Sequence, residues 1–456
     1  MFFHSSFTFR LVGPSVVAAF IASATSAATL APDAVFPSSL VVQAEEVASV
    51  SPANLASPVA IGDDLYVIDQ TGSIQRQTAT GFENVFDASD APAGITLSSS
   101  SAVLNIAGEG DTAYAVFRST TVPSGIAVNP LPTGYTGGLY DVVFRYDRAA
   151  DGSFTNPTAL TAFESISGNG HLGGGLLALP NGSVAFARGD ALGFNVDGLH
   201  APQDAGEFVG KILLIDGTSG AVEVAVDGVR NVQRMTFVDD TKAEIAFADI
   251  GATTAEEINV ISVTDITDTN NVENFGWGRN VDGIAREGTF YIDDGNTSNP
   301  GTLATAIGVA PTPEPGFIQP FAQFGREEVT GLFAVSGPVA SSTSFDAIGL
   351  LFGDLVNGSL MANLDGAAGT LNDVFEVALQ DINGDPLAFT DLNNGNRVDV
   401  RFFNFANGDA GVLLERTGQI FRLTEVDIAA VPLPQSSALL LCAVGLLGFR
   451  RRARNV

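Results

Sequence analysis

The chain has 456 residues, with 21 Lys and Arg against 51 Asp and Glu, and a formal net charge of −30. Hydrophobic residues make up 45% of the sequence, which is enough for a sizeable core and excludes an intrinsically disordered chain. A surface this negative repels phosphate backbones, so nucleic acid is excluded as a partner. Cys442 is the single cysteine, which excludes an intrachain disulfide and a thiolate metal cluster.

The N-terminal residues have the pattern of a secretory signal. Arg10 precedes the apolar stretch LVGPSVVAAFIASA, and small residues follow up to Ala28. A positive charge, a short apolar segment and a small-residue cleavage site are typical of export signals. We therefore predict that residues 1–28 are a signal peptide and that the protein is exported.

The C-terminal residues 431–456 have a second targeting pattern. The string VPLP from Val431 precedes an apolar run that stops at an arginine cluster, Arg450–Arg452 and Arg454. This layout resembles the PEP-CTERM class of sorting signals in its VPLPA variant, which implies processing by an exosortase-type membrane peptidase. The alternative is a permanent C-terminal anchor. Either way the body is expected in the periplasm, at the outer cell surface or outside the cell, with membrane contact only through this segment.

The residues between the two signals are predicted to be mostly β. Short alternating apolar runs bounded by Gly, Asn and Asp recur, and Asn-Gly and Asp-Asp pairs favour tight hairpin turns. Six such hairpins are predicted, beginning at Ser57, Leu104, Gly175, Met235, Leu350 and Val400. Their recurrence every 50 to 70 residues or so, with a larger gap before Leu350, is typical of a β-propeller. A sandwich or a β-helix remains an alternative on this evidence.

Five strings in the middle of the chain carry a family resemblance. They are GHLGGGLLALPNGSVAFARGD from Gly170, APQDAGEFVGKILLID from Ala201, GVRNVQRMTF from Gly228, ADIGATTAEEINVI from Ala248 and NFGWG from Asn274. In order and spacing they resemble the soluble quinoprotein glucose/sorbosone dehydrogenases. The resemblance implies an all-β, six-bladed β-propeller over residues 41–426, with pyrroloquinoline quinone (PQQ) and Ca²⁺ as cofactors.

The residue types also permit sugar oxidation on their own chemistry. Removing the proton of a sugar hydroxyl needs a base, and an imidazole suits this role near neutral pH. His171, set among glycines that allow a ligand to approach, is the best-placed histidine. Asp190 could orient it, while Arg230 and Asn231 offer hydrogen-bond donors to quinone oxygens or carboxylates.

The resemblance assigns these residues to specific roles. It implies His171 as the catalytic base with Asp190 as its partner, Arg230, Asn231 and Arg397 as PQQ contacts, and the carbonyls of Gly251 and Ala252 as Ca²⁺ ligands. The sequence departs from the family pattern from Ser98 onward, where SSSSAVLNIAGEG replaces a segment with a PQQ-binding glutamine.

Other acidic motifs are expected to be structural. Glu256 and Glu257 are adjacent, so on a strand they point to opposite faces and cannot flank one glycosidic bond. The string DINGDP from Asp381 has the first three ligand positions of an EF-type calcium loop but lacks its glycine and glutamate, so we expect a solvated turn, with a weak non-EF calcium site as the alternative. Trp277 is expected to pack between blades, although it could instead stack on a sugar ring.

Two functions therefore remain open from the sequence. One is an exported PQQ-dependent sugar dehydrogenase-like enzyme that transfers hydride from a carbohydrate to a quinone. The other is a non-catalytic propeller that binds carbohydrate at the cell surface or in the extracellular matrix.

Overall fold

The computed structural model describes residues 40–427 except 52–54, 57, 100, 169, 193–199, 252–254, 280–284, 288–289, 293–316, 319, 326–333, 341–344, 346–347 and 365–373. The predicted signal segment 1–28 and sorting segment 431–456 lie outside these residues. Within the described part of the chain, no helix is long and apolar enough to cross a membrane.

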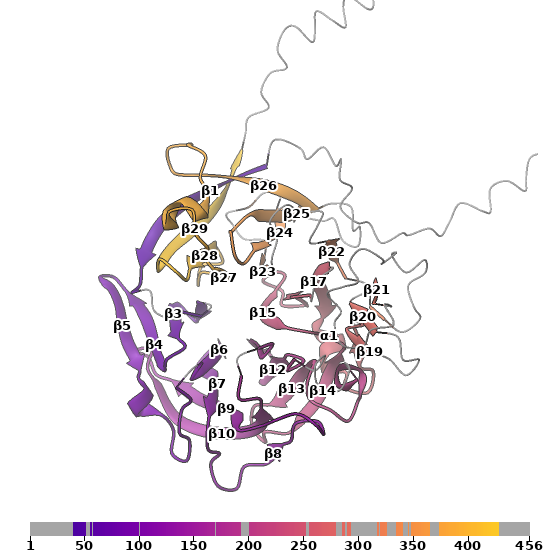
Figure 1. Ribbon diagram of the computed structural model, residues 1–456. Coiled ribbons are helices and arrows are strands. Elements are labelled where there is room, and N and C mark those ends of the chain that lie inside the picture. Colours follow the sequence, from indigo (N-terminus) through magenta and orange to yellow (C-terminus); the bar gives the residue numbers. More distant parts are fainter. Residues whose placement is uncertain are drawn as a thin grey trace, which may run out of the picture.

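The described residues form mainly antiparallel sheets arranged around a central axis in a propeller-like way (Figure 1). Four sheets of four or five strands are separate blades. The first holds β2 (Val59–Ile61), β3 (Asp64–Asp69), β4 (Ser73–Thr78) and β5 (Gly81–Phe86). The second holds β6 (Val103–Glu109), β7 (Thr112–Ser119), β9 (Leu139–Arg148), β10 (Phe154–Ser165) and β8 (Val128–Asn129).

The third and fourth blades follow along the chain. The third holds β11 (Gly173–Ala178), β12 (Ser183–Arg188), β13 (Lys211–Asp216), β14 (Val222–Asp227) and β18 (Glu273–Asn274). The fourth holds β15 (Val232–Phe237), β16 (Glu244–Asp249), β17 (Ala255–Ser262) and β22 (Ala322–Gly325).

The remaining large sheet has eight strands. In spatial order these are β23 (Val335–Ala340), β24 (Ile348–Asp354), β25 (Leu360–Leu364), β26 (Val374–Gln380), β1 (Leu40–Ser49), β29 (Gln419–Asp427), β28 (Ala410–Leu414) and β27 (Val400–Asn404). The prediction of six separate blades is therefore wrong for the described residues, which form four. The reason is β1, which pairs in parallel with β26 and antiparallel with β29 and so joins two strand groups into one sheet.

Smaller elements lie outside these sheets. A three-stranded sheet consists of β19 (Gly278–Arg279), β20 (Ala285–Glu287) and β21 (Phe290–Ile292). The short helices are η1 (Ala88–Asp90), η3 (Ala201–Gln203), α1 (Val263–Thr267) and η5 (Phe389–Asn393).

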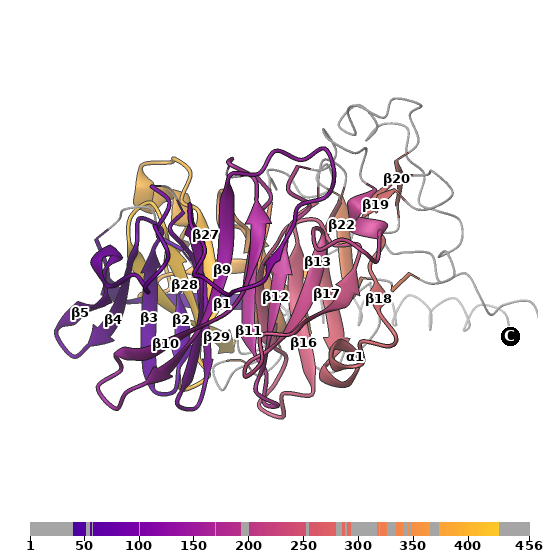
Figure 2. The ribbon, with the colours of Figure 1, turned by 90° about the horizontal axis from the view of Figure 1, so that it is seen from below.

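The six predicted hairpins are confirmed, and most of them supply the innermost strand of a sheet. The innermost strands β2, β6, β11, β15, β23 and β27 contact one another in sequence, and β27 contacts β2. Their ring surrounds the axis, and Figure 2 shows the strands of the sheets standing side by side along it. Residues at the start of different inner strands are therefore brought together at one end of the axis.

The hydrophobic core lies between neighbouring sheets. Phe163 of β10 and Phe186 of β12 are both fully buried, with ring centroids 5.9 Å apart. Phe403 of β27 and Leu65 of β3 belong to another buried cluster, which joins the last sheet to the first. Apolar packing between sheets thus holds the ring together and leaves the axis for polar side chains.

The position of β1 predicts that its buried residues stabilise the whole ring. Val42 is fully buried and lies between Leu379 of β26 and Glu425 of β29. Val42→Ala removes two methyl groups from the core and should lower the free energy of unfolding by about 2 kcal/mol. Urea unfolding measures this, with Glu45→Ala, an exposed site on the same strand, as a control that should change it by less than about 0.5 kcal/mol. Equal effects of the two substitutions would contradict this role of β1.

Candidate active site

A cavity of about 400 Å³ lies at the end of the axis where the inner strands begin. Its walls include Asn105 of β6, Gly173 and Gly174 of β11, Gln233 of β15 and Arg401 of β27. Gln70, Ser101, His171 and Asn231 add further polar groups. No Asp or Glu is among the described residues that line it, although the chain carries a net charge of −30. The cavity is therefore rich in hydrogen-bond donors and suits a ligand with many oxygen acceptors.

His171 lies at the wall of this cavity in a conformation that the surrounding glycines permit. Its backbone φ of 49° is in the left-handed region, which is uncommon for residues other than glycine. A Cβ at Gly189 would lie 2.0 Å from the His171 carbonyl oxygen, so only glycine fits on the strand exit that faces it. The Gly-Asp ending of the predicted hairpin thus allows the His171 loop to pack directly against residues 189–190.

Asp190 holds the imidazole from behind. Its Oδ1 lies 2.8 Å from His171 Nδ1 and accepts a hydrogen bond from the backbone N–H of Leu192 at 3.1 Å. Its Oδ2 accepts from Trp277 Nε1 at 3.1 Å. The Asp190 side chain is 1% exposed, whereas that of His171 is 25% exposed. The structure thus brings Asp190 to His171 as expected, while its catalytic role stays a prediction.

Arg230 determines the tautomer of His171. The Arg230 Nη2 lies 2.8 Å from His171 Nε2. A guanidinium can only donate, so Nε2 accepts and the ring proton is on Nδ1, where it is donated to Asp190. His171 is therefore a neutral imidazole with its basic nitrogen toward Arg230, and a substrate hydroxyl would have to replace that contact.

The Arg230 side chain is fixed by several further contacts. Its Nη1 donates to the carbonyls of Ile250 at 2.7 Å and Gly251 at 2.6 Å, and its guanidinium lies 5.3 Å from the Trp277 ring centroid. Trp277 is 3% exposed, which confirms that it packs inside the protein. It contacts both Asp190 and Arg230 and thereby supports the two partners of His171.

Asp249 fixes the backbone of the Arg230–Asn231 pair. Its two carboxylate oxygens accept from the backbone N–H groups of Arg230 at 2.8 Å and Asn231 at 2.7 Å. Asn231 Oδ1 in turn accepts from the Gly173 N–H at 3.1 Å. Burial raises the pKa of Asp249 to about 6, and this outweighs the two backbone hydrogen bonds and the charge of Arg230, which lower it.

The structure does not place Arg397 at the cavity. Its side chain is 53% exposed and pairs with Asp399, which also pairs with Arg416. Arg401, four residues along, lines the cavity instead and donates to Gln233 at 2.7 Å and Glu415 at 2.9 Å. The sequence pattern missed this because Arg397 precedes β27 whereas Arg401 lies on it, facing the axis.

The predicted Ca²⁺ ligands are only partly described. Ala252 lies outside the described residues, and the Gly251 carbonyl accepts from Arg230. The described residues hold no group of three or more His, Cys, Asp or Glu that could bind a metal ion. Fully buried Glu256 accepts from the backbone N–H groups of Gly251 at 3.2 Å and Val335 at 3.1 Å, in line with the structural role expected for it.

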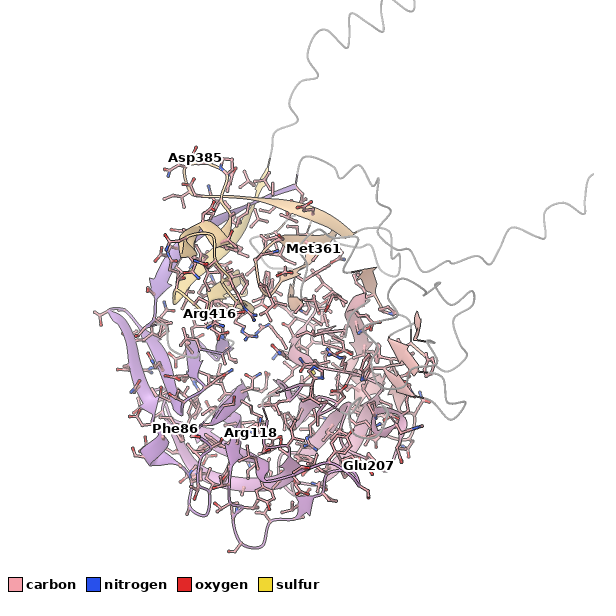
Figure 3. The ribbon with its side chains drawn as sticks, viewed as in Figure 1. Phe86, Arg118, Glu207, Met361, Asp385 and Arg416 are labelled. Atoms are coloured by element: carbon pink, nitrogen blue, oxygen red, sulfur yellow. The ribbon has the colours of Figure 1, made fainter. Side chains whose placement is uncertain are left out.

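The DINGDP segment forms a closed turn far from the cavity. Asp381 Oδ1 accepts from the backbone N–H groups of Asn383 at 2.8 Å and Asp385 at 3.0 Å. Asp385 lies at the outer edge of the ring (Figure 3). The expectation of a solvated turn is confirmed.

Two glutamines that sequence reasoning missed also line the cavity. Gln70 follows β3 and Gln233 lies on β15, so they come from different blades. The segment from Ser98 lacks the glutamine that the resembling family has there. Gln70 and Gln233 bring carboxamides to the cavity from other positions in the chain. The signal that could have found them is their position near the ends of inner or adjacent strands.

Comparison with known proteins identifies the fold. No model of a known protein family matches the sequence, and no curated protein matches it. The structure is similar to a proposed oxidoreductase (glucose dehydrogenase) of Thermus thermophilus, with a TM-score of 0.51 and 16% identity, covering 84% of this chain and 99% of that one.

Two further solved structures are more distant. The holo form of the PQQ domain of pyranose dehydrogenase from Coprinopsis cinerea has a TM-score of 0.49 and 12% identity, covering 84% of this chain and 95% of its own. A family AA12 carbohydrate-active enzyme of Trichoderma reesei, in its calcium structure, has a TM-score of 0.46 and 14% identity, covering 88% and 100%. At these identities the similarity concerns the fold alone.

The raised pKa of Asp249 predicts a stability difference that depends on pH. Its pKa is about 6 in the folded protein against an ordinary value of 3.8, so unfolding releases a proton between these values. The free energy of unfolding of the wild type should fall relative to that of Asp249→Asn as the pH rises from about 4 to about 6, by about 3 kcal/mol in total. Urea unfolding of both proteins across this range measures the difference. A difference that stays constant, or that moves in favour of the wild type, would show that burial does not dominate at Asp249.

Proposed function

We propose that this protein is a sugar dehydrogenase-like oxidoreductase in which His171 removes the proton of a carbohydrate hydroxyl. The observation that supports this most directly is the position of the His171 imidazole, which lies at the wall of a donor-rich cavity with its Nδ1 2.8 Å from the buried Asp190 carboxylate. Carbohydrates present many hydroxyl and ether oxygens, and Asn231, Gln70 and Gln233 can hydrogen-bond to them. The fold shared with the Thermus protein is consistent with the proposal.

The residues of the cavity also fit an anionic quinone. PQQ carries three carboxylates, and the described lining contains a guanidinium, four carboxamides and no carboxylate. Arg401, Asn231 and the two glutamines of the lining would hold it. Arg230 is not in the lining and would reach it only by leaving His171 Nε2. When bound, PQQ supplies an acceptor for the hydride and its two electrons from the sugar carbon. Arg401 and Arg230 already have protein partners, Glu415 and two carbonyls, which they would share with or give up to the cofactor.

His171 and Asp190 perform the proton transfer. His171 Nε2 would take the sugar O–H proton as the C–H hydride is lost to a bound acceptor, so that the substrate carbon would become a carbonyl. The resulting imidazolium is stabilised by Asp190, whose carboxylate is ready to accept a charge-assisted hydrogen bond at 2.8 Å. Arg230 has to leave Nε2 for this step, which also removes a positive charge from the forming imidazolium.

The Ca²⁺ prediction has less support than the PQQ prediction. The one predicted ligand that the structure describes, the Gly251 carbonyl, is hydrogen-bonded to Arg230. A Ca²⁺ ion needs six to eight oxygen ligands, and the described residues around Gly251 offer no acidic cluster to supply them. The proposed proton transfer does not involve the ion.

The finer organisation is also part of the proposal. The eight-stranded sheet contains two inner strands, β23 and β27, so we treat it as two blades joined at their outer edges by β1. With the four separate blades this makes six radial units, as the closed ring of inner strands supports. We further propose that residues 1–28 direct export and that an exosortase-type peptidase processes residues 431–456, leaving the body in the periplasm, at the cell surface or outside the cell.

One specific observation favours the alternative function, carbohydrate binding without turnover. The polar groups that catalysis would need already have protein partners. His171 Nε2 contacts Arg230, and Arg401 donates to Gln233 and Glu415. A cavity of this kind can bind neutral sugars through its carboxamides without a cofactor.

Steady-state kinetics test the proposal. The protein is incubated with PQQ, with and without Ca²⁺, and aldose oxidation is followed with a dye acceptor. His171→Ala should lower kcat/KM by about 100- to 10,000-fold, because it removes the general base. His200→Ala is the matched control: it is an exposed histidine outside the cavity and should leave the activity unchanged.

The outcomes separate the two functions. Sugar binding by calorimetry without oxidation at saturating PQQ would support the binding module and overturn the enzyme. Oxidation that His171→Ala leaves unchanged would overturn the role of His171 while retaining the enzyme.

A further inference from the structure

A second cavity of about 400 Å³ lies at the opposite end of the inner strands. It is lined by later residues of the same strands: Ala107 to Glu109 of β6, Leu176 to Ala178 of β11, Arg234 to Phe237 of β15 and Asn404 of β27. Asn105 is shared with the first cavity. The two cavities are therefore two ends of one polar axis, and the chemistry proposed for His171 does not use this end.

Arg234 is the distinctive group in this second cavity. Its guanidinium has only two weak hydrogen bonds, from Nε to the Pro338 carbonyl at 3.4 Å and from Nη1 to the Pro58 carbonyl at 3.5 Å. No Asp or Glu among the described residues forms an ion pair with it, and its Nη2 has no hydrogen-bond partner there. Burial lowers its pKa to about 10, so it stays protonated at neutral pH.

The other charges of this cavity cancel each other. Lys242 Nζ contacts both carboxylate oxygens of Glu109, at 2.7 and 2.6 Å, and lies 5.4 Å from the Phe237 ring centroid. The described lining thus has one uncompensated positive charge, that of Arg234, in a chain with a net charge of −30. Partly buried charges in proteins are normally paired, so an unpaired guanidinium facing a cavity points to a counter-ion that the protein itself does not supply.

We infer that this second cavity binds a small oxyanion, of the carboxylate or phosphate class, through the guanidinium of Arg234. A planar guanidinium with a free Nη2 can bind two oxygens of such an ion side by side, whereas a halide would use it less fully. Thr236, a hydroxyl-bearing neighbour on the cavity wall, makes only long contacts to Phe237 O at 3.4 Å and Asn404 Oδ1 at 3.3 Å, so it can turn toward the same ion. The inference does not depend on the catalytic role of His171.

Calorimetric titration tests the site directly. Inorganic phosphate and D-gluconate, a small sugar acid, are titrated separately into the protein at fixed ionic strength set with NaCl. We expect Arg234→Gln to weaken binding of the preferred anion by about 10- to 100-fold, because a charge-assisted pair of hydrogen bonds is lost. Arg416→Gln is the matched control: it removes a half-exposed guanidinium that lines neither cavity, and it should leave anion affinity unchanged. Arg401→Gln reports separately on anion binding in the His171 cavity.

Thermal unfolding provides a second measurement. Phosphate or gluconate should raise the Tm of the wild type and of Arg416→Gln but not that of Arg234→Gln. If Arg234→Gln fails to fold, Arg234→Lys keeps the charge but loses the planar fork, and should bind more weakly than the wild type. The ratio of the phosphate affinity to the gluconate affinity of the wild type distinguishes a phosphate site from a carboxylate site.

Three results would overturn the inference. These are the absence of binding of either anion to the wild type, equal binding to the wild type and Arg234→Gln, and a loss of binding in Arg401→Gln alone. The last would place the anion in the His171 cavity instead.

Discussion

The pairing of β1 with both β26 and β29 is the constraint on which the arrangement of the molecule depends. Because β1 comes from the start of the described chain and β29 from its end, this sheet closes the ring. Closure brings β27 against β2 and so completes the wall of inner strands. Both cavities have walls from β27 as well as from β6, β11 and β15, and neither would exist in an open arrangement.

Inside this ring, buried carboxylates position the polar groups of the site. Asp190 holds His171 and Trp277, Asp249 holds the backbone of Arg230 and Asn231, and Glu256 holds Gly251 and Val335. Each one accepts hydrogen bonds from at least one strand or loop other than its own, so each links parts of the chain that are separated in sequence. Burying a carboxylate is costly unless such donors are present, and here the donors are the very groups whose positions the site requires. These buried carboxylates therefore lie behind the residues that line the His171 cavity, and the lining itself offers hydrogen-bond donors.

The sequence allowed the candidate site residues to be predicted where they lie close together in the chain. The hairpins were predictable because turn residues and alternation are encoded within about 15 residues, and His171 and Asp190 flank one such hairpin. The prediction of the Arg230–Asn231 pair came from a string that resembles the family.

In contrast, β1 and β23 were missed, because their pairing depends on strands far away in the chain. Arg401 was missed for a similar reason: whether Arg397 or Arg401 faces the axis depends on where β27 begins, and strand boundaries are poorly determined by local pattern. The number of separate blades was wrong because nothing in the sequence near residue 40 reveals that this strand joins two sheets.

The two ends of the axis differ in whether their arginine side chains already have strong hydrogen-bond acceptors in the protein. This difference affects which ligands each end can bind. At the His171 end, Arg401 and Arg230 are both engaged by protein acceptors, so a ligand must compete with Glu415, Gln233 and backbone carbonyls. Such competition weakens binding of any single anion but also selects for ligands that satisfy several donors at once, as a polyhydroxylated sugar or a multi-oxygen quinone does. At the opposite end, Arg234 makes only long hydrogen bonds to the carbonyls of Pro338 at 3.4 Å and Pro58 at 3.5 Å, and Lys242 is neutralised by Glu109. One strand, β15, contributes Gln233 to the first cavity and Arg234 to the second, because the two cavities lie at opposite ends of the axis along which β15 runs. A single inner strand thus contributes a neutral carboxamide to the His171 cavity and a guanidinium without an ion-pair partner among the described residues to the second cavity. One ring of inner strands can in this way form two cavities that favour different ligands.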